Sequence, residues 1–205
     1  MQLIDTHCHI HDLEFFDGES ANSTYNQASE QLEALLLIGT SLVDSKRAVE
    51  FAHLHPEKCW ACVGIHPHEA SKLTEAEITE HLAGIAQLAS DEKVRAIGEC
   101  GFDFYYNERS EVLSKQKQLF AGQLEIAKQY NLPLSFHVRE AFDDFWPVFD
   151  EFTGIRGVLH SFTDRPKHLE KALERGLYIG INGIATFTSH DWQRELFKTI
   201  PIESI

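Results

Sequence analysis

The sequence lacks any long apolar run, which disfavours one whole class of protein. No stretch of about 18 consecutive apolar residues occurs in its 205 residues, so we expect no transmembrane helix. The N-terminus has neither the basic start nor the apolar stretch of a signal peptide. The four cysteines are scattered, and reduced thiols are the default in a chain without a secretion signal. We therefore expect a cytoplasmic protein with no membrane contact.

Basic residues are also scarce. The chain has 18 Lys and Arg against 32 Asp and Glu, a formal net charge of −14 at pH 7. Proteins that coat nucleic acid without regard to its sequence need a broad basic surface, so this class is disfavoured. A nucleic-acid substrate remains open, because cations bound in a pocket attract phosphate locally even on an acidic protein.

The chain also lacks linkers, internal repeats and low-complexity segments, so we expect a single domain over residues 1–205. Short apolar runs alternate with longer amphipathic stretches along it. The predicted strands are 3–7, 34–39, 60–66, 94–99, 133–137, 157–160 and 177–181. The predicted helices are 21–31, 41–54, 75–89, 110–130, 141–152, 166–175 and 191–198. Such alternation implies a parallel sheet covered by helices.

A doubly wound sheet and a (β/α)8 TIM barrel both fit this alternation. No glycine-rich phosphate loop follows the first strand, which disfavours a Rossmann fold. Polar residues stand at or just beyond the C-terminal ends of five different predicted strands, namely His7, His66, Glu99, His137 and His160. Barrel enzymes assemble their active sites from that rim. We therefore predict a TIM barrel, with the eighth strand and its helix missing from these 205 residues.

Histidine is the unusual component of the composition, with twelve residues, most of them in short clusters that suggest metal binding. His7 and His9 follow an apolar strand, and residues two apart on a strand point the same way. Both imidazoles are therefore expected to share one cation. Asp5 lies on the same face and is expected to orient these ligands.

Five short motifs, each after its own predicted strand, resemble the successive motifs of the TatD family of metal-dependent hydrolases. They are Ile4-Asp5-Thr6-His7-Cys8-His9, Gly64-Ile65-His66-Pro67-His68, Ile97-Gly98-Glu99-Cys100-Gly101-Phe102-Asp103, His137-Val138-Arg139-Glu140-Ala141 and His160-Ser161-Phe162-Thr163. Each motif alone is weak evidence for a family. The five motifs occur in the same order as in the family and together cover nearly the whole chain. The resemblance implies a TIM barrel of the metal-dependent hydrolase type and cleavage of phosphodiester bonds.

The resemblance also implies a ligand set for two divalent metal ions. Carried onto this sequence, the ligands are His7, His9, Glu99, His137 and His160. Glu99 would bridge the two ions, and we predict Glu99 and His137 as catalytic residues. The alternatives are a structural acid bonded to a helix N-terminus for Glu99, and satisfied core histidines for His137 and His160. Each histidine taken alone favours the core alternative, but the other ligands at the rim favour metal binding. The family's further ligand, an aspartate after strand eight, has no counterpart before Ile205, which predicts weakened metal binding and poor catalysis.

Other residues are candidates for substrate contact. They are His66, His68 and Arg139, the last because a guanidinium matches phosphate geometry. A loop histidine without a role and a surface arginine at a helix start are the alternatives for His68 and Arg139. The aromatic run of Phe102, Phe104, Tyr105 and Tyr106 either stacks on bases or packs in the core.

The leading hypothesis for function is a TatD-like deoxyribonuclease that acts on DNA, or another phosphodiester, from an exposed end. An activated water and two divalent metals would carry the hydrolysis. The ligand types suit Zn, Mn, Fe or Ni, and the resemblance implies Mg as well. Two alternatives remain: amidohydrolase-type cleavage of a small C–N or ester substrate, and a truncated, catalytically impaired chain that binds metal. No obligate protein partner is predicted.

Overall fold

The computed structural model describes residues 3–205 and contains one sheet of seven parallel strands, in the order β1-β2-β3-β4-β5-β6-β7. The strands are β1 (Leu3–Cys8), β2 (Leu32–Ile38), β3 (Cys59–Val63), β4 (Val94–Asp103), β5 (Leu134–Arg139), β6 (Gly157–Leu159) and β7 (Tyr178–Ile179). Each strand pairs in parallel with the next one in the sequence. The C-terminal ends of all seven strands therefore lie at the same rim of the sheet.

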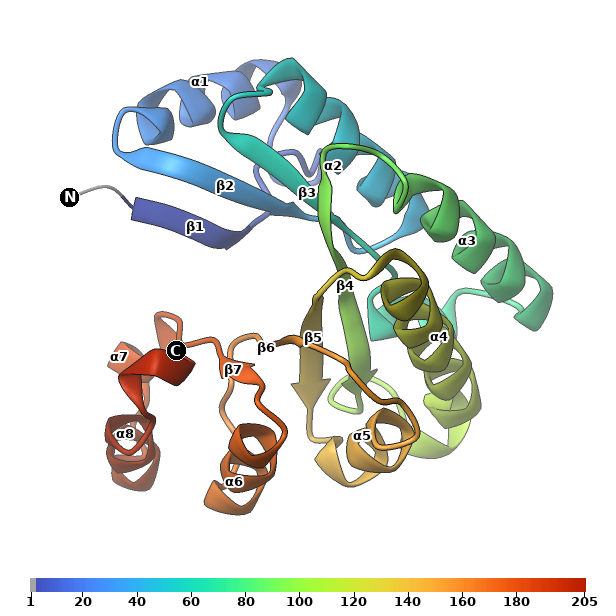
Figure 1. Ribbon diagram of the computed structural model, residues 1–205, viewed down its shortest axis with the longest axis vertical. Coiled ribbons are helices and arrows are strands. Elements are labelled where there is room, and N and C mark those ends of the chain that lie inside the picture. Colours follow the sequence, from blue (N-terminus) through green and yellow to red (C-terminus); the bar gives the residue numbers. More distant parts are fainter. Residues whose placement is uncertain (1–2) are drawn as a thin grey trace.

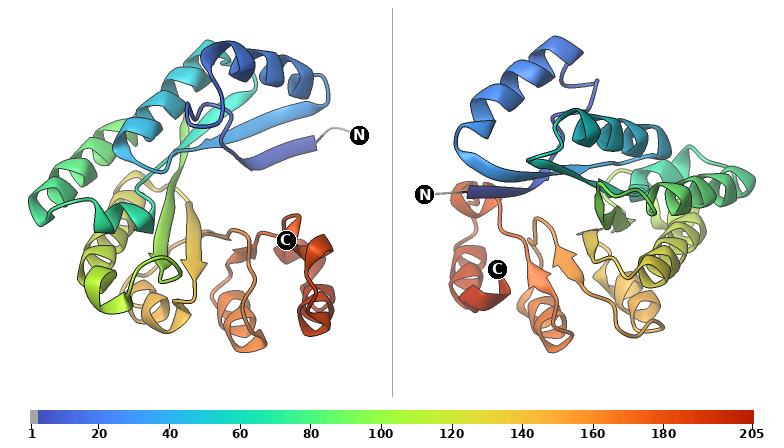
Figure 2. Two further views of the ribbon diagram at one scale, coloured as in Figure 1. Left: turned by 180° about the vertical axis from the view of Figure 1, so that it is seen from behind. Right: turned by 45° about the horizontal axis from the view of Figure 1, so that its top comes forward.

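Helices connect the strands and cover the convex side of the curled sheet (Figure 1). They are α1 (Gly18–Ser29), α2 (Leu42–Leu54), α3 (Glu75–Leu88), α4 (Arg109–Tyr130), α5 (Phe142–Phe149), α6 (Pro166–Glu174), α7 (Ile184–Phe187) and α8 (Asp191–Lys198), with the 3-10 turns η1 (Pro67–Ser71) and η2 (Ile202–Ser204). The sheet curls into an incomplete barrel that is open between β1 and β7 (Figure 2). The predicted TIM-barrel architecture is confirmed, and no eighth strand occurs among residues 3–205.

Local signals in the sequence set several helix ends. Ser41 accepts a hydrogen bond from the N–H of Asp44 at the start of α2. Thr74 and Glu77 form a reciprocal capping box at the start of α3. Asn131 ends α4 in the left-handed conformation, at φ 53°, as the sequence predicts from asparagine at this position. These caps satisfy N–H and C=O groups that a helix end leaves free.

Phenylalanines form the centre of the core between the sheet and its helices. Phe136 of β5 is fully buried, and its ring lies 6.1 Å from Phe120 of α4 and 5.5 Å from Phe145 of α5. These edge-to-face contacts fix α4 and α5 against β5. They also fix the backbone of His137, the next residue in the strand.

Strand β4 differs from the prediction, which ended it at Glu99. The strand continues to Asp103, because Cys100–Asp103 pair in register with Phe136–Arg139 of β5. Glu99 therefore lies inside a strand and not at its tip. The short elements η1, α7 and η2 were not predicted, since three to five residues are too few for a periodic pattern.

The helices were also compared with the length and the hydropathy that crossing a bilayer requires. No helix within residues 3–205 combines the two.

Replacing Phe136 by alanine is expected to lower the free energy of unfolding by about 3–5 kcal/mol. The reason is that the buried ring leaves a cavity between α4, α5 and the sheet. Urea unfolding followed by circular dichroism measures the change. Leu54→Ala is the control, because this side chain is 70% exposed and its loss should cost less than about 0.5 kcal/mol. Equal losses in the two variants would contradict this account of the core.

Candidate metal centre

The carboxylate of Glu99 is the point on which the histidines converge. Glu99 is only 4% exposed, and its Oε1 lies 2.6 Å from Nε2 of His160 and 2.8 Å from Nδ1 of His137. Its Oε2 lies 3.5 Å from Nε2 of His7. Nε2 of His66 is 3.9 Å from Oε1. Side chains from β1 and β5, and from the residues that follow β3 and β6, therefore meet at one buried carboxylate.

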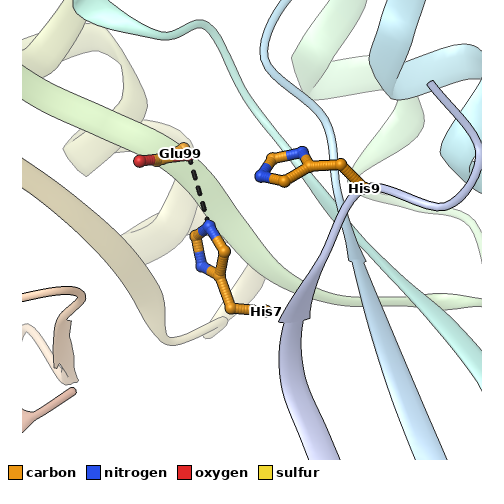
Figure 3. Close-up of side chains that lie close together, drawn as sticks. All are labelled: His7, His9 and Glu99. Carbon is orange, nitrogen blue, oxygen red and sulfur yellow. Dashed lines mark ion pairs between the residues drawn. The ribbon is translucent and has the colours of Figure 1, made fainter. Parts of the chain in front are cut away.

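His7 and His9 approach Glu99 from β1 and the residues just after it (Figure 3). One nitrogen from each ring and one oxygen of Glu99 all lie within 4.8 Å of one another. The ring of His7 also stacks on that of His160, with centroids 4.0 Å apart. Burial and the neighbouring His7 lower the pKa of His9, so its imidazole is neutral at pH 7 and offers a lone pair. This group suits a divalent cation.

Glycines allow the strands to come close enough for this convergence. Gly98 and Gly101 flank Glu99 with φ of 134° and 144°, a region that side chains rarely adopt. A Cβ on Gly98 would collide with the carbonyl oxygen of Ser135, and one on Gly101 with that of His137. Both positions therefore require glycine.

His137 lies between two carboxylates. Its Nδ1 is 2.8 Å from Oε1 of Glu99, and its Nε2 is 2.8 Å from Oδ2 of Asp103. Burial lowers the pKa of His137, but the hydrogen bonds to Asp103 and Glu99 outweigh burial and raise it to about 9. If Nε2–H donates to Asp103, Nδ1 is left as a metal ligand beside Glu99. A carboxylate behind a ligating histidine is the usual arrangement in metal sites.

His66 has a different role, which its hydrogen bonding fixes. Its Nδ1 accepts a hydrogen bond from the backbone N–H of His68 at 3.1 Å, so a neutral His66 carries its proton on Nε2. Burial and the nearby His137 lower the pKa of His66 to about 3, which keeps the ring neutral. Nε2 is therefore a hydrogen-bond donor. This suits contact with a substrate oxygen better than metal ligation, although Nε2 lies within reach of a cation at Glu99.

The charge balance of the site also fits a cation. Burial raises the pKa of Glu99, but hydrogen bonds from His137, His160 and His7 hold it well below its usual range. A buried carboxylate is stable only when it is paired. In the metal-free protein, the proton on His137, whose pKa is raised, supplies positive charge. Divalent ions would supply the same charge and leave the imidazoles neutral, as ligands must be.

Asp103 is the site residue to which the sequence analysis gave no role. It is fully buried, and its Oδ2 lies 2.8 Å from His137 and 3.0 Å from Nε2 of His68. Its Oδ1 accepts the N–H of Tyr105 at 2.8 Å. Burial raises the pKa of Asp103, but the hydrogen bonds from His137 and from Tyr105 N–H lower it to about 2. The signal available in the sequence was the motif that runs from Ile97 to Asp103. The even spacing of Asp103 from Glu99 has a meaning only because β4 continues to Asp103.

Gln116 of α4 holds this part of the site in place. Its Oε1 accepts the N–H of Asp103 at 3.2 Å, and its Nε2 donates to the carbonyl of Asp103 at 2.9 Å and to that of Pro67 at 3.3 Å. The side chain is fully buried. The end of β4 and the turn that follows His66 are thus fixed to one helix.

Arg139 ends β5, two residues after His137. Its guanidinium carbon lies 3.5 Å from the centre of the Tyr105 ring and 5.6 Å from that of Tyr106. None of the side-chain hydrogen bonds or ion pairs within residues 3–205 involves this guanidinium. A half-buried cation without an acidic partner, this close to the metal centre, is available to an anion.

Other candidates lie apart from the histidine cluster or pack in the core. Asp5 accepts a hydrogen bond from the backbone N–H of His7 at 3.0 Å, so it holds the strand rather than a ring. Phe102 is fully buried in the core and Phe104 packs against it. Tyr105 and Tyr106, in contrast, are exposed. The alternative of core packing therefore applies to the two phenylalanines only.

A cavity of about 640 Å³ opens beside the centre. Its walls include His137, Arg139, His160, Phe187 and His190. Two of the predicted metal ligands and the unpaired guanidinium therefore share one accessible space.

Parallel strands curled into a TIM barrel, with histidines and a buried glutamate gathered where the strands converge, define a fold of the metal-dependent hydrolase type. The family model described as "TatD related DNase" matches residues 4–205. This chain therefore belongs to the TatD family.

Individual relatives agree with this assignment. The chain is 37% identical over 174 residues to the "3'-5' ssDNA/RNA exonuclease TatD" of Pantoea sp. (strain At-9b), which covers 83% of this chain and 65% of the relative. It is 30% identical to the "uncharacterized metal-dependent hydrolase YabD" of Bacillus subtilis (strain 168), over 97% of this chain and 76% of that protein. The chain thus spans about two thirds of the length of the exonuclease relative.

A solved structure supports the fold in the same way. The crystal structure of YJJV, a TatD homolog from Escherichia coli K12, superposes with a TM-score of 0.83 at 25% sequence identity. The match covers 98% of this chain and 76% of that protein.

Metal binding at pH 7.5 is expected to release about one proton from His137, because its raised pKa keeps it protonated until a cation displaces the proton. Asp103→Asn removes one of the two carboxylates that raise this pKa, so it should release fewer protons. Calorimetric titration with Zn²⁺ or Mn²⁺, in buffers of different ionisation enthalpy, counts them.

Asp91→Asn is the matched control. Asp91 also faces an imidazole, that of His53 at 3.0 Å, but on the surface. On metal binding, the Asp91→Asn variant should release as many protons as the unaltered protein. Equal release by Asp103→Asn, with its circular dichroism spectrum unchanged, would contradict the role given to Asp103.

Proposed function

We propose that this chain hydrolyses phosphodiester bonds at the ends of single-stranded DNA or RNA, with divalent metal ions as cofactors. The observation that carries the proposal is the buried carboxylate of Glu99, which faces His7 through one oxygen and His137 and His160 through the other. The printed names of the relatives, a 3'-5' ssDNA/RNA exonuclease and a metal-dependent hydrolase, support the substrate class and the cofactor.

The donor set supports two cations that share Glu99. His7 and His9 would hold one, and His137 and His160, which both contact Oε1 of Glu99, the other; His66 also lies within reach of a cation at Glu99 and His137. When bound, two such ions polarise the phosphoryl group and lower the pKa of a water molecule. Zn, Mn and Ni suit imidazole-rich sites by ligand preference, and Mg remains a candidate. Glu99 and His137 are the proposed catalytic residues, since both lie where the phosphate would meet the ions.

Three further side chains are proposed to contact substrate. Nε2 of His66 lies 3.9 Å from Oε1 of Glu99 and carries the proton of the neutral ring, so it is proposed to donate to a phosphoryl oxygen bound beside Glu99. Arg139 offers a planar fork of donors that matches two phosphate oxygens. Nε2 of His68 lies 3.0 Å from Oδ2 of Asp103, and its ring lies 6.2 Å from that of His137.

The proposal also covers the domain organisation and the cellular location of the chain. A single sheet runs through residues 3–205, and we propose one domain over residues 1–205 with no obligate protein partner. The four cysteines are free and three of them are buried, which fits the proposed reducing, cytoplasmic location.

The test is release of nucleotides from a 5'- or 3'-labelled single-stranded oligonucleotide, with Zn²⁺, Mn²⁺, Ni²⁺ and Mg²⁺ compared. Activity should require metal and disappear in EDTA. Glu99→Gln should lower kcat/KM by more than about 100-fold, because groups behind the ligands already cost 10–100-fold.

Glu57→Gln provides the matched control, since this glutamate lies on the surface between α2 and β3. It should retain full activity. A Glu99→Gln variant that cleaves as fast as the unaltered protein, or cleavage that persists without metal, would overturn the proposal.

A further inference from the structure

Two neighbouring tyrosines stand exposed beside the metal centre. Tyr105 and Tyr106 come two and three residues after the end of β4 and are 51% and 68% exposed. Single exposed aromatics are common on proteins. This pair, in contrast, borders the proposed catalytic centre, and the guanidinium of Arg139, which has no acidic partner, lies on Tyr105. The combination suggests a binding site.

The pair is fixed to the same groups as the metal centre. Asp103 holds the N–H of Tyr105 through Oδ1 and the ring of His137 through Oδ2. Tyr106 meets Tyr105 edge to face at 4.7 Å and His68 at 5.2 Å, with interplanar angles of 88° and 81°. No ring lies parallel to Tyr106 among these partners. The side chain of Tyr106 is therefore positioned by two edge-to-face contacts and is still 68% exposed.

The surroundings of the two tyrosines differ in charge from one side to the other. A cavity of about 420 Å³ lies on one side, and its wall holds both tyrosines, Asn107, three glutamates (Glu108, Glu111 and Glu140) and Arg109, which is paired with Asp144. The amide and the carboxylates are able to bond the polar edge of a base, while the carboxylates repel phosphate. Arg139, stacked on Tyr105 at 3.5 Å, is the nearby group that attracts phosphate.

We propose that Tyr106, held by Tyr105, is a stacking platform for one unpaired base next to the cleaved phosphodiester, and that Arg139 binds the phosphate of that nucleotide. This inference rests on the proposed function and deepens it by naming what selects the substrate. Every base has a π-face, so the platform accepts any sequence. A base inside a duplex is stacked on both sides, so the platform selects single strands.

Binding without cleavage tests the platform directly. In EDTA, the Kd of a fluorescently labelled single-stranded oligonucleotide is measured by anisotropy. Tyr106→Ala should weaken binding about tenfold, in line with the loss of one base–aromatic stack. Tyr106→Phe keeps the ring and should bind as the unaltered protein does. Tyr178→Ala, which removes a tyrosine that is 54% exposed at the start of β7, should also have no effect.

An abasic substrate distinguishes stacking from a general effect on the loop. Without the terminal bases, the unaltered protein should bind as weakly as Tyr106→Ala binds the intact strand, and Tyr106→Ala should cause no further loss. An equal loss by Tyr106→Ala on intact and abasic strands would overturn the platform. So would a Tyr106→Phe variant as weak as Tyr106→Ala.

The outcome is separable from the fate of the proposed function. Tyr106-dependent binding without any hydrolysis would support the platform and reject the hydrolase. Metal-dependent hydrolysis with a Kd that is insensitive to Tyr106→Ala would support the hydrolase and reject the platform.

Discussion

The structure depends on one buried negative charge, the carboxylate of Glu99. Such a group costs several kcal/mol when it is unpaired, so the fold must bring positive charge to it. The fold surrounds it with the imidazoles of His7 in β1, His137 in β5 and His160 directly after β6. Of these, His137 has a raised pKa and carries positive charge at pH 7. Curling the sheet is what brings these strand ends together, and two glycines in β4 allow the close approach. The curled shape of the sheet and the arrangement of the site therefore depend on each other.

A second buried carboxylate, that of Asp103, connects the metal centre to residues at the surface. It holds the far side of His137, the ring of His68 and the backbone of Tyr105. Gln116 of α4 in turn holds Asp103. A change at the metal centre is thus connected through a few short contacts to the exposed residues that border it. Binding of substrate and binding of cations are expected to be coupled for this reason.

Much of this was predictable from the sequence, because its signals are local. Alternating apolar runs and amphipathic stretches gave the order of strands and helices, and the short motifs after the strands gave the residues that meet at Glu99. The rest depends on contacts between distant segments. The extension of β4 to Asp103 follows from pairing with β5, and the tautomer of His66 from a turn of the backbone. Neither leaves a periodic pattern.

The central claim is that Glu99 and the histidines around it hold divalent cations. A crystal structure of this chain soaked in Zn²⁺ or Mn²⁺, with anomalous scattering recorded at the metal edge, tests it most directly. The account predicts anomalous density between Glu99 and His137, with oxygen and nitrogen ligands at about 2.0–2.2 Å, and density beside His7 and His9. Density confined to surface carboxylates, with Glu99 still hydrogen-bonded to its imidazoles, would contradict the account.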